Sequence, residues 1–138
     1  MSEATAPPKK VLIIDDEESI VQYLELLLQD NGYTTLTAAD GAEGMAKAQA
    51  DPPDLICLDI TMPEKSGVRF YRELRDSDNE KLNRIPVFVV TAVTGYGGDS
   101  DAFKRFLDTR SQFPPPERFF SKPIDREEFL RAVQEVLS

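Results

Sequence analysis

The sequence contains no histidine and only one cysteine, Cys57. Without histidine, the chain cannot use imidazole as a general base, build a histidine-containing triad or ligate zinc through histidine. A single cysteine cannot form an internal disulfide. Its place in an apolar run is typical of a small buried core residue, not of a reactive thiol.

Long apolar runs and a positive charge balance are also missing. The longest aliphatic runs, residues 11–14 and 87–90, are far shorter than a membrane span. No stretch before them would form a signal peptide, so we expect a cytoplasmic protein. The net charge of −9 argues against a nucleic-acid surface, because binding to phosphates needs clustered Lys and Arg. It suits a metal ion or a partner with a basic patch.

The composition is otherwise that of a globular protein, with 41% hydrophobic and 30% charged residues among 138. This length fits one domain. Residues 1–9 are small and polar and predict a flexible tail, and residues 10–138 form the expected domain. The sequence stops directly after its last predicted helix, so we expect no attached output domain.

Short apolar runs alternate with amphipathic stretches through this domain. Four consecutive aliphatic residues are typical of a strand that is buried on both faces. Gly32 is placed to end the first helix, and Asp40, with Glu43 three residues later, is placed to cap the second. The predicted strands are residues 10–15, 33–38, 55–59, 86–90 and 118–121, and the predicted helices cover residues 17–31 and 41–50 and begin again near Ser66, Ser100 and Asp125.

Five strand–helix units in series predict a parallel sheet with helices on both faces. The expected fold class is α/β, a single doubly wound five-stranded sheet of the flavodoxin-like (βα)5 type with strand order 2-1-3-4-5. In such a sheet, ligands bind beyond the carboxyl ends of the strands, near the point where the order reverses. Polar residues at those ends are therefore the candidates for a functional site.

Four of the five strands end in such residues, which are Asp15 with Asp16, Asp59, Thr91 and Lys122. The strand order places the two aspartate strands side by side, where three carboxylates repel one another unless a cation lies among them. Mg²⁺ binds few carboxylates together with waters and phosphate oxygens, so it suits this group. The Lys122 ammonium and the Thr91 hydroxyl would then hold a phosphoryl group on an aspartate.

Each residue also has an ordinary structural interpretation when it is taken alone. Asp15 and Asp16 precede a helix and would act as N-cap residues. Asp59 precedes a proline-containing loop and would form a turn. Thr91 would be a strand-end hydroxyl and Lys122 a solvated charge. All of them together, in this order at successive strand ends, favour a functional site.

These stretches resemble the receiver domain of response regulators in two-component signalling systems, and the resemblance covers residues 10–138. The matching motifs are VLIIDDE at 11–17, LDITMP at 58–63 with Gly67, PVFVVTA at 86–92 and FSKP at 120–123.

The resemblance implies that Asp59 is the phosphoacceptor and becomes a 4-aspartylphosphate. It places Mg²⁺ on the carboxylates of Asp16 and Asp59 and on the backbone carbonyl of Thr61, with Asp15 acting largely through water.

The resemblance also implies a switch. Lys122 would pair with the phosphoryl group, Thr91 would be the switch hydroxyl and Phe119 the switch aromatic. The bond between Lys122 and Pro123 would be cis.

By the same resemblance, the chain is a signalling domain that catalyses only its own phosphoryl transfer and dephosphorylation. The expected donor is a sensor histidine kinase or a histidine phosphotransfer protein. The expected output is phosphorylation-dependent contact with a protein target, and homodimer formation on phosphorylation is compatible with it. Nucleic acid and membrane are not expected partners.

The segment from Thr91 to Lys122 departs from the family because it is longer than usual, with glycines at 95, 97 and 98 and prolines at 114–116. We expect phosphorylation to act mainly through residues 92–119, because glycines make reorganisation of a loop easy. The alternative is that this segment is a passive surface loop.

Two other functions lack a residue that their motifs require. A phosphatase of the haloacid-dehalogenase type needs an aspartate two positions after its nucleophile, where this chain has Thr61. A G-x-G-x-x-G nucleotide loop fails because Ser100 stands in the last glycine position. The remaining alternative is a docking module that has the receiver fold but is not phosphorylated.

Overall fold

The computed structural model of the chain describes residues 8–59, 66–91, 117–121 and 123–137. In chain order its elements are β1 (Lys10–Ile14), α1 (Glu18–Asp30), β2 (Thr34–Ala38), α2 (Gly41–Ala50), β3 (Leu55–Asp59), α3 (Ser66–Arg75), α4 (Glu80–Asn83), β4 (Val87–Thr91), β5 (Arg118–Ser121) and α6 (Arg126–Leu137).

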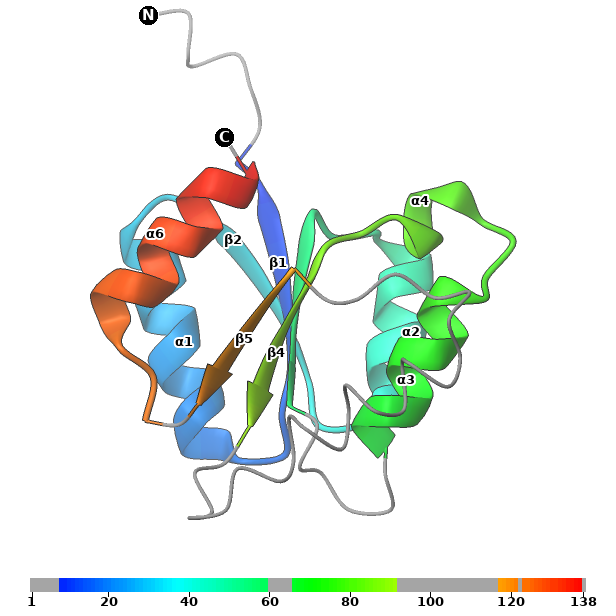
Figure 1. The fold of residues 1–138 in the computed structure, drawn as a ribbon, viewed down its shortest axis with the longest axis horizontal. Helices are drawn as coiled ribbons and strands as arrows, with labels where there is room; N and C mark the ends of the chain where they lie inside the picture. Colours follow the sequence, from blue (N-terminus) through cyan, green and yellow to red (C-terminus); the bar gives the residue numbers. More distant parts are fainter. Residues whose placement is uncertain (1–7, 60–65, 92–116, 122, 138) are drawn as a thin grey trace, which may run out of the picture.

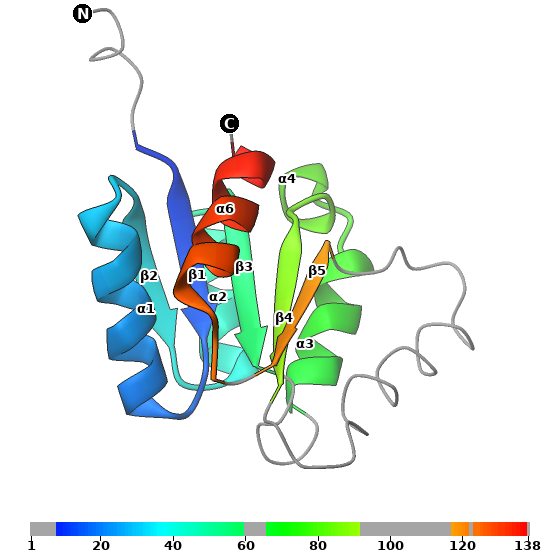
Figure 2. The ribbon, with the colours of Figure 1, turned by 60° about the vertical axis from the view of Figure 1, so that its left-hand side comes forward.

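The five strands form one sheet in the order β2-β1-β3-β4-β5, and every neighbouring pair is parallel. Helices α1 and α6 cover one face, and α2, α3 and α4 cover the other (Figure 1). All five strands therefore point toward the same edge of the sheet (Figure 2). The predicted fold class and strand order are confirmed.

Alternation along the strands divides the apolar residues into two cores, one on each face of the sheet. In β1, Leu12 and Ile14 belong to the core beneath α2 and α3, whereas Val11 and Ile13 belong to the core beneath α1 and α6. Successive side chains of a strand point to opposite faces, and both faces are covered, so all four are buried. Full burial of each such side chain contributes about 1.5–3 kcal/mol.

The second core contains three aromatic rings in mutual contact. Phe120 of β5 lies 5.4 Å from Phe88 of β4 and 5.4 Å from Phe129 of α6, measured between ring centroids. Such tilted and edge-to-face contacts add about 0.5–1.5 kcal/mol each beyond the buried area. They hold the short strand β5 against the rest of the sheet.

The predicted ends of two helices are confirmed in detail. The Asp40 side chain accepts a hydrogen bond from Glu43 N–H at 2.8 Å, so it caps α2. Gly32 adopts φ = 90° after α1, a left-handed conformation that glycine tolerates best. There Tyr33 N–H bonds to Leu28 O, and Gly32 N–H bonds to a carbonyl one residue further on, which is the Schellman pattern of a helix end.

Most element bounds agree with the predictions to within one residue, but α4 was not predicted. Its four residues are too few to show a helical period. Asn79 caps it by accepting from Lys81 N–H at 2.9 Å, and Leu82 is buried in the core. Arg75 of α3 donates to the Ile85 carbonyl at 2.8 Å and so holds the segment in place.

The helix predicted near Ser100 lies outside the described residues. Within the described part of the chain, no helix combines the length and apolarity that spanning a membrane requires.

Helix α2 packs unusually close to β1 at Gly44. A Cβ atom on Gly44 would lie 2.5 Å from Cδ1 of Ile14 and 3.0 Å from its Cγ1. Ile14 is fully buried and immediately precedes Asp15. The absence of a side chain at Gly44 therefore allows the start of α2 to approach the end of β1.

We predict that Gly44→Ala destabilises the protein, because overpacking of the new methyl group against Ile14 costs about 1–3 kcal/mol. The gain of about 1 kcal/mol that alanine brings to a helix offsets only part of this cost, so a net loss of up to about 2 kcal/mol is expected. Ile14→Val, which removes Cδ1, should itself cost about 1 kcal/mol. In urea unfolding, the double variant should be more stable than the sum of the two single losses predicts, and strictly additive losses would contradict the contact.

Candidate functional site

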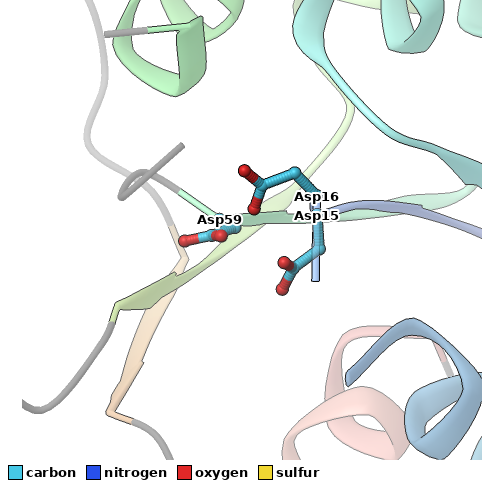
Figure 3. Close-up of side chains that lie close together, drawn as sticks. All are labelled: Asp15, Asp16 and Asp59. Atoms are coloured by element: carbon cyan, nitrogen blue, oxygen red, sulfur yellow. The ribbon is translucent and has the colours of Figure 1, made fainter. Parts of the chain in front are cut away.

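Three aspartates converge at the carboxyl edge of the sheet. One carboxylate oxygen from each of Asp15, Asp16 and Asp59 lies within 4.8 Å of the others. Figure 3 shows them at the ends of β1 and β3, with the carboxylates of Asp15 and Asp16 on opposite sides of the β1 end. The structure thus brings together the three carboxylates that the sequence singled out.

The register between β1 and β3 explains this convergence. The last pair between these strands is Ile14 with Leu58, so Asp15 and Asp59 follow at the same level. Adjacent strands lie about 4.8 Å apart, which places the two side chains next to each other. The Asp15 N–H donates to the Ala38 carbonyl at 3.1 Å, so the pairing with β2 also continues to this point.

The three carboxylates differ in exposure. Asp15 is 4% exposed and Asp59 is 2% exposed, whereas Asp16 is exposed. Burial of a charged carboxylate is costly unless hydrogen bonds or an opposite charge compensate it. For Asp15, one oxygen accepts from Glu17 N–H at 2.9 Å.

The interpretation of Asp15 and Asp16 as N-cap residues is wrong. The N-cap of α1 is Glu17, which makes no side-chain capping hydrogen bond. The two aspartates lie before that position, where their side chains are part of the carboxylate cluster instead.

A cleft of about 320 Å³ adjoins the cluster on the β2 side. Its lining includes Asp15, Asp16, Ala38, Ala39 and Glu43, so it joins the carboxylates to the turn between β2 and α2. The sequence pattern predicts only a helix-capping role for Glu43. The sequence does contain a signal for the contact between Glu43 and Lys47, because a spacing of four residues places both side chains on one face of the helix.

The other predicted site residues are placed only in part. Thr91 ends β4 and pairs with Ser121 of β5, but its side chain lies outside the described part of the structure, as do Thr61 and Lys122 and therefore the predicted cis bond before Pro123. Phe119 is half-buried and packs against the core cluster beneath α2 and α3.

Cys57 is buried in β3, as predicted. Burial raises the pKa of its thiol well above the ordinary value, so the thiolate is not formed at neutral pH. Its role is that of a core residue.

The donor set of the cluster fits a hard divalent cation. It offers only oxygen atoms from three carboxylates, and two of those carboxylates are buried. Mg²⁺ prefers such ligands and completes its shell with water or phosphate oxygens. Softer ions prefer nitrogen or sulfur ligands, and the sequence has no histidine and keeps its one cysteine in the core.

Comparisons with known proteins agree on one family. A model described as the response regulator receiver domain matches residues 11–134. The chain is 32% identical over 130 residues to the polar-differentiation response regulator DivK of Brucella anthropi, covering 94% of this chain and 97% of DivK. The chemotaxis protein CheY4 of Vibrio cholerae has a similar structure, with a TM-score of 0.77, 32% identity and coverage of 94% of this chain and 99% of CheY4.

A longer relative matches over a shorter stretch. The chain is 43% identical over 84 residues to the alkaline phosphatase synthesis transcriptional regulatory protein PhoP of Bacillus subtilis. The match covers 61% of this chain and only 33% of PhoP, so it spans about a third of that regulator.

Repulsion within the cluster leads to a prediction on stability. Without divalent cations at low ionic strength, Asp16→Asn should raise the free energy of unfolding by about 1 kcal/mol, because like charges about 4 Å apart in water repel by that amount. Added Mg²⁺ should stabilise the parent protein more than the variant, because the variant has lost one of the three carboxylates of the cluster. Urea unfolding in EDTA and in Mg²⁺ measures both effects.

Asp78→Asn is the matched control, because Asp78 is exposed and lies apart from the cluster in the chain. Asp78→Asn should change neither the free energy of unfolding in EDTA nor the stabilisation by Mg²⁺. A loss of stability for Asp16→Asn in EDTA would show that Asp16 stabilises the metal-free fold.

Proposed function

The chain belongs to the response regulator receiver domain family, and we propose on that premise that Asp59 accepts a phosphoryl group in a Mg²⁺-dependent reaction. Receiver domains are signalling domains, and the proposed role of this one is regulatory. One observation carries the proposal. Asp59 ends β3 as a buried carboxylate within 4.8 Å of two further carboxylates.

The proposed transfer begins with attack by an Asp59 carboxylate oxygen on the phosphorus of a phosphohistidine. The P–N bond breaks, the imidazole nitrogen leaves with the electron pair and takes up a proton, and an acyl phosphate remains on Asp59. Dephosphorylation ends the signal: water attacks this phosphorus, and the products are inorganic phosphate and the free carboxylate. Such transfer depends mainly on positioning and charge neutralisation, which the cluster supports without histidine.

The carboxylates of Asp16 and Asp59 and the backbone carbonyl of Thr61 are the proposed Mg²⁺ ligands, with Asp15 acting largely through water. When it is bound, the ion neutralises negative charge on the carboxylates and on the transferring group. The fixed Asp15 side chain, whose oxygen accepts from Glu17 N–H, keeps a second carboxylate beside the acceptor.

The proposed response to phosphorylation involves Lys122, Thr91 and Phe119. The phosphoryl group adds acceptor oxygens, which the Lys122 ammonium and the Thr91 hydroxyl would bind. Phe119 is half-buried against a core cluster, so a change in its position would be transmitted to that core. Residues 92–116, which connect Thr91 to this part of the chain, would reorganise with it.

The proposed donor is a sensor histidine kinase or a histidine phosphotransfer protein, and the proposed output is a phosphorylation-dependent protein contact, which includes homodimer formation. We propose a cytoplasmic location. The alternative of an unphosphorylated docking module differs from this proposal in one measurable property, which is labelling of Asp59.

We predict that Asp59→Asn reduces labelling by a small phosphodonor to background, because an amide cannot serve as the nucleophilic carboxylate. Labelling of the parent protein should require Mg²⁺ and be lost in EDTA. Phosphate incorporation followed by mass spectrometry measures both.

Asp54→Asn is the matched control for this experiment. Asp54 lies just before the first residue of β3, at the end of the strand opposite Asp59, and accepts a hydrogen bond from Lys10 N–H at 2.8 Å. This variant should label like the parent. A parent protein that takes up no phosphate in Mg²⁺ would support the docking module instead.

A further prediction concerns how far the structural response to phosphorylation extends along the chain. On binding beryllofluoride, which mimics the phosphoryl group, amide exchange should slow in residues 92–119 as well as in residues 59–67. Asp59→Asn should show neither change. Confinement of the change to residues 59–67 would mean that the long segment is a passive loop.

A further inference from the structure

Glu43 of α2 makes more contacts than a helix cap requires. One of its carboxylate oxygens accepts from Ala39 N–H at 2.9 Å, and the other lies 3.2 Å from Nζ of Lys47. The hydrogen bond from Ala39 is the main cause that lowers the pKa of Glu43, and Lys47 adds to it. Glu43 is therefore held as a carboxylate between the turn before α2 and a lysine one helical turn later.

Lys47 extends this contact to the strand. Besides Glu43, its ammonium donates to the backbone carbonyl of Thr37 in β2. Together, Glu43 and Lys47 therefore hold backbone groups on both sides of Ala38, because Thr37 precedes it and Ala39 follows it. These two side chains from the same helix therefore reinforce the strand pairing that holds Ala38 beside Ile14.

Ala38 in turn contacts the carboxylate cluster through the backbone. Its carbonyl accepts the hydrogen bond from Asp15 N–H at 3.1 Å, and the Asp15 side chain is buried in the cluster. Asp15, Ala38, Ala39 and Glu43 also line the same cleft. A series of contacts thus connects Glu43 and Lys47 of α2 through Ala38 to Asp15, a residue of the proposed metal site.

We infer that Glu43 and Lys47 are positioning residues for the metal site, because they hold the end of β2, where the Ala38 carbonyl accepts the Asp15 N–H and so orients Asp15. This inference rests on the proposed Mg²⁺ site. The positioning role differs from simple attraction of a cation by a nearby carboxylate. Positioning depends on hydrogen-bond geometry, whereas attraction depends on charge alone.

Three variants separate geometry from charge. Glu43→Ala and Glu43→Gln remove the same charge, but the glutamine oxygen can still accept from Ala39 N–H. We expect the Mg²⁺ dissociation constant to rise about fivefold for Glu43→Ala and less than about twofold for Glu43→Gln. Loss of a residue that contacts a metal ligand directly weakens metal binding by about tenfold or more, and Glu43 acts one contact further away. Lys47→Met removes a positive charge. If charge alone mattered, this variant would bind Mg²⁺ more tightly, whereas the positioning role predicts weaker binding.

Amide exchange of the metal-free protein provides a readout that is independent of the ion. Glu43→Ala and Lys47→Met should speed exchange of the Asp15 amide, which bonds to Ala38, and Glu43→Gln should leave it close to the parent rate. If the parent binds no Mg²⁺, the proposed function fails, and the exchange rates still decide whether these residues hold Asp15.

Asp125→Ala is the control for loss of stability alone. Asp125 caps α6 by accepting from Glu127 N–H and Glu128 N–H at 3.0 Å and 3.1 Å, so its loss weakens a helix on the face of the sheet opposite α2 (Figure 1). It should change neither Mg²⁺ affinity nor Asp15 exchange. The inference is overturned if Asp125→Ala matches Glu43→Ala, if Glu43→Gln matches Glu43→Ala, or if Lys47→Met binds Mg²⁺ more tightly.

Discussion

Parallel pairing between β1 and β3 is the constraint on which the rest of this structure depends. These two strands end together, because Ile14 pairs with Leu58, and the next residue of each is an aspartate. The pairing is held from both faces of the sheet, since the four apolar residues before each aspartate are buried in the two cores. A shift of the register by one residue would exchange the faces of all these side chains and separate the carboxylates.

The carboxylate cluster gathers three acidic side chains at one edge of the sheet and is the basis of the proposed function. Asp15 and Asp59 are nearly fully buried acids at the edge of an apolar sheet, and a third acid, Asp16, lies within 4.8 Å. Repulsion among them favours any ligand that brings positive charge to this edge. A cluster of carboxylate oxygens at this edge suits the Mg²⁺-dependent function proposed above, because hard divalent cations prefer such ligands. Contacts around the cluster, such as Glu17 N–H with Asp15, hold its geometry against this repulsion.

Local signals in the sequence were sufficient where a few neighbouring residues determine the structure. The cap at Asp40 and the helix end at Gly32 were predicted because each depends on hydrogen bonds within five residues. Helix α4 was missed because four residues show no period, and its stability comes from contacts such as that between Arg75 and the Ile85 carbonyl. The interpretation of Asp15 as a helix cap failed for a similar reason, since an offset of two residues from the N-cap Glu17 decides whether its side chain caps α1 or lies at the end of β1.

The sequence by itself determined the α/β class, the strand order expected for it and the three aspartates of the site, because hydrophobic periodicity and strand-end position are properties of the order of residues. The tertiary structure alone decided the exposure of each aspartate and the connection from Glu43 and Lys47 through Ala38 to Asp15. These depend on the register between strands and on the close approach of α2 at Gly44. Distances across a sheet are set by the packing of whole elements, and no pattern within a single segment contains that information.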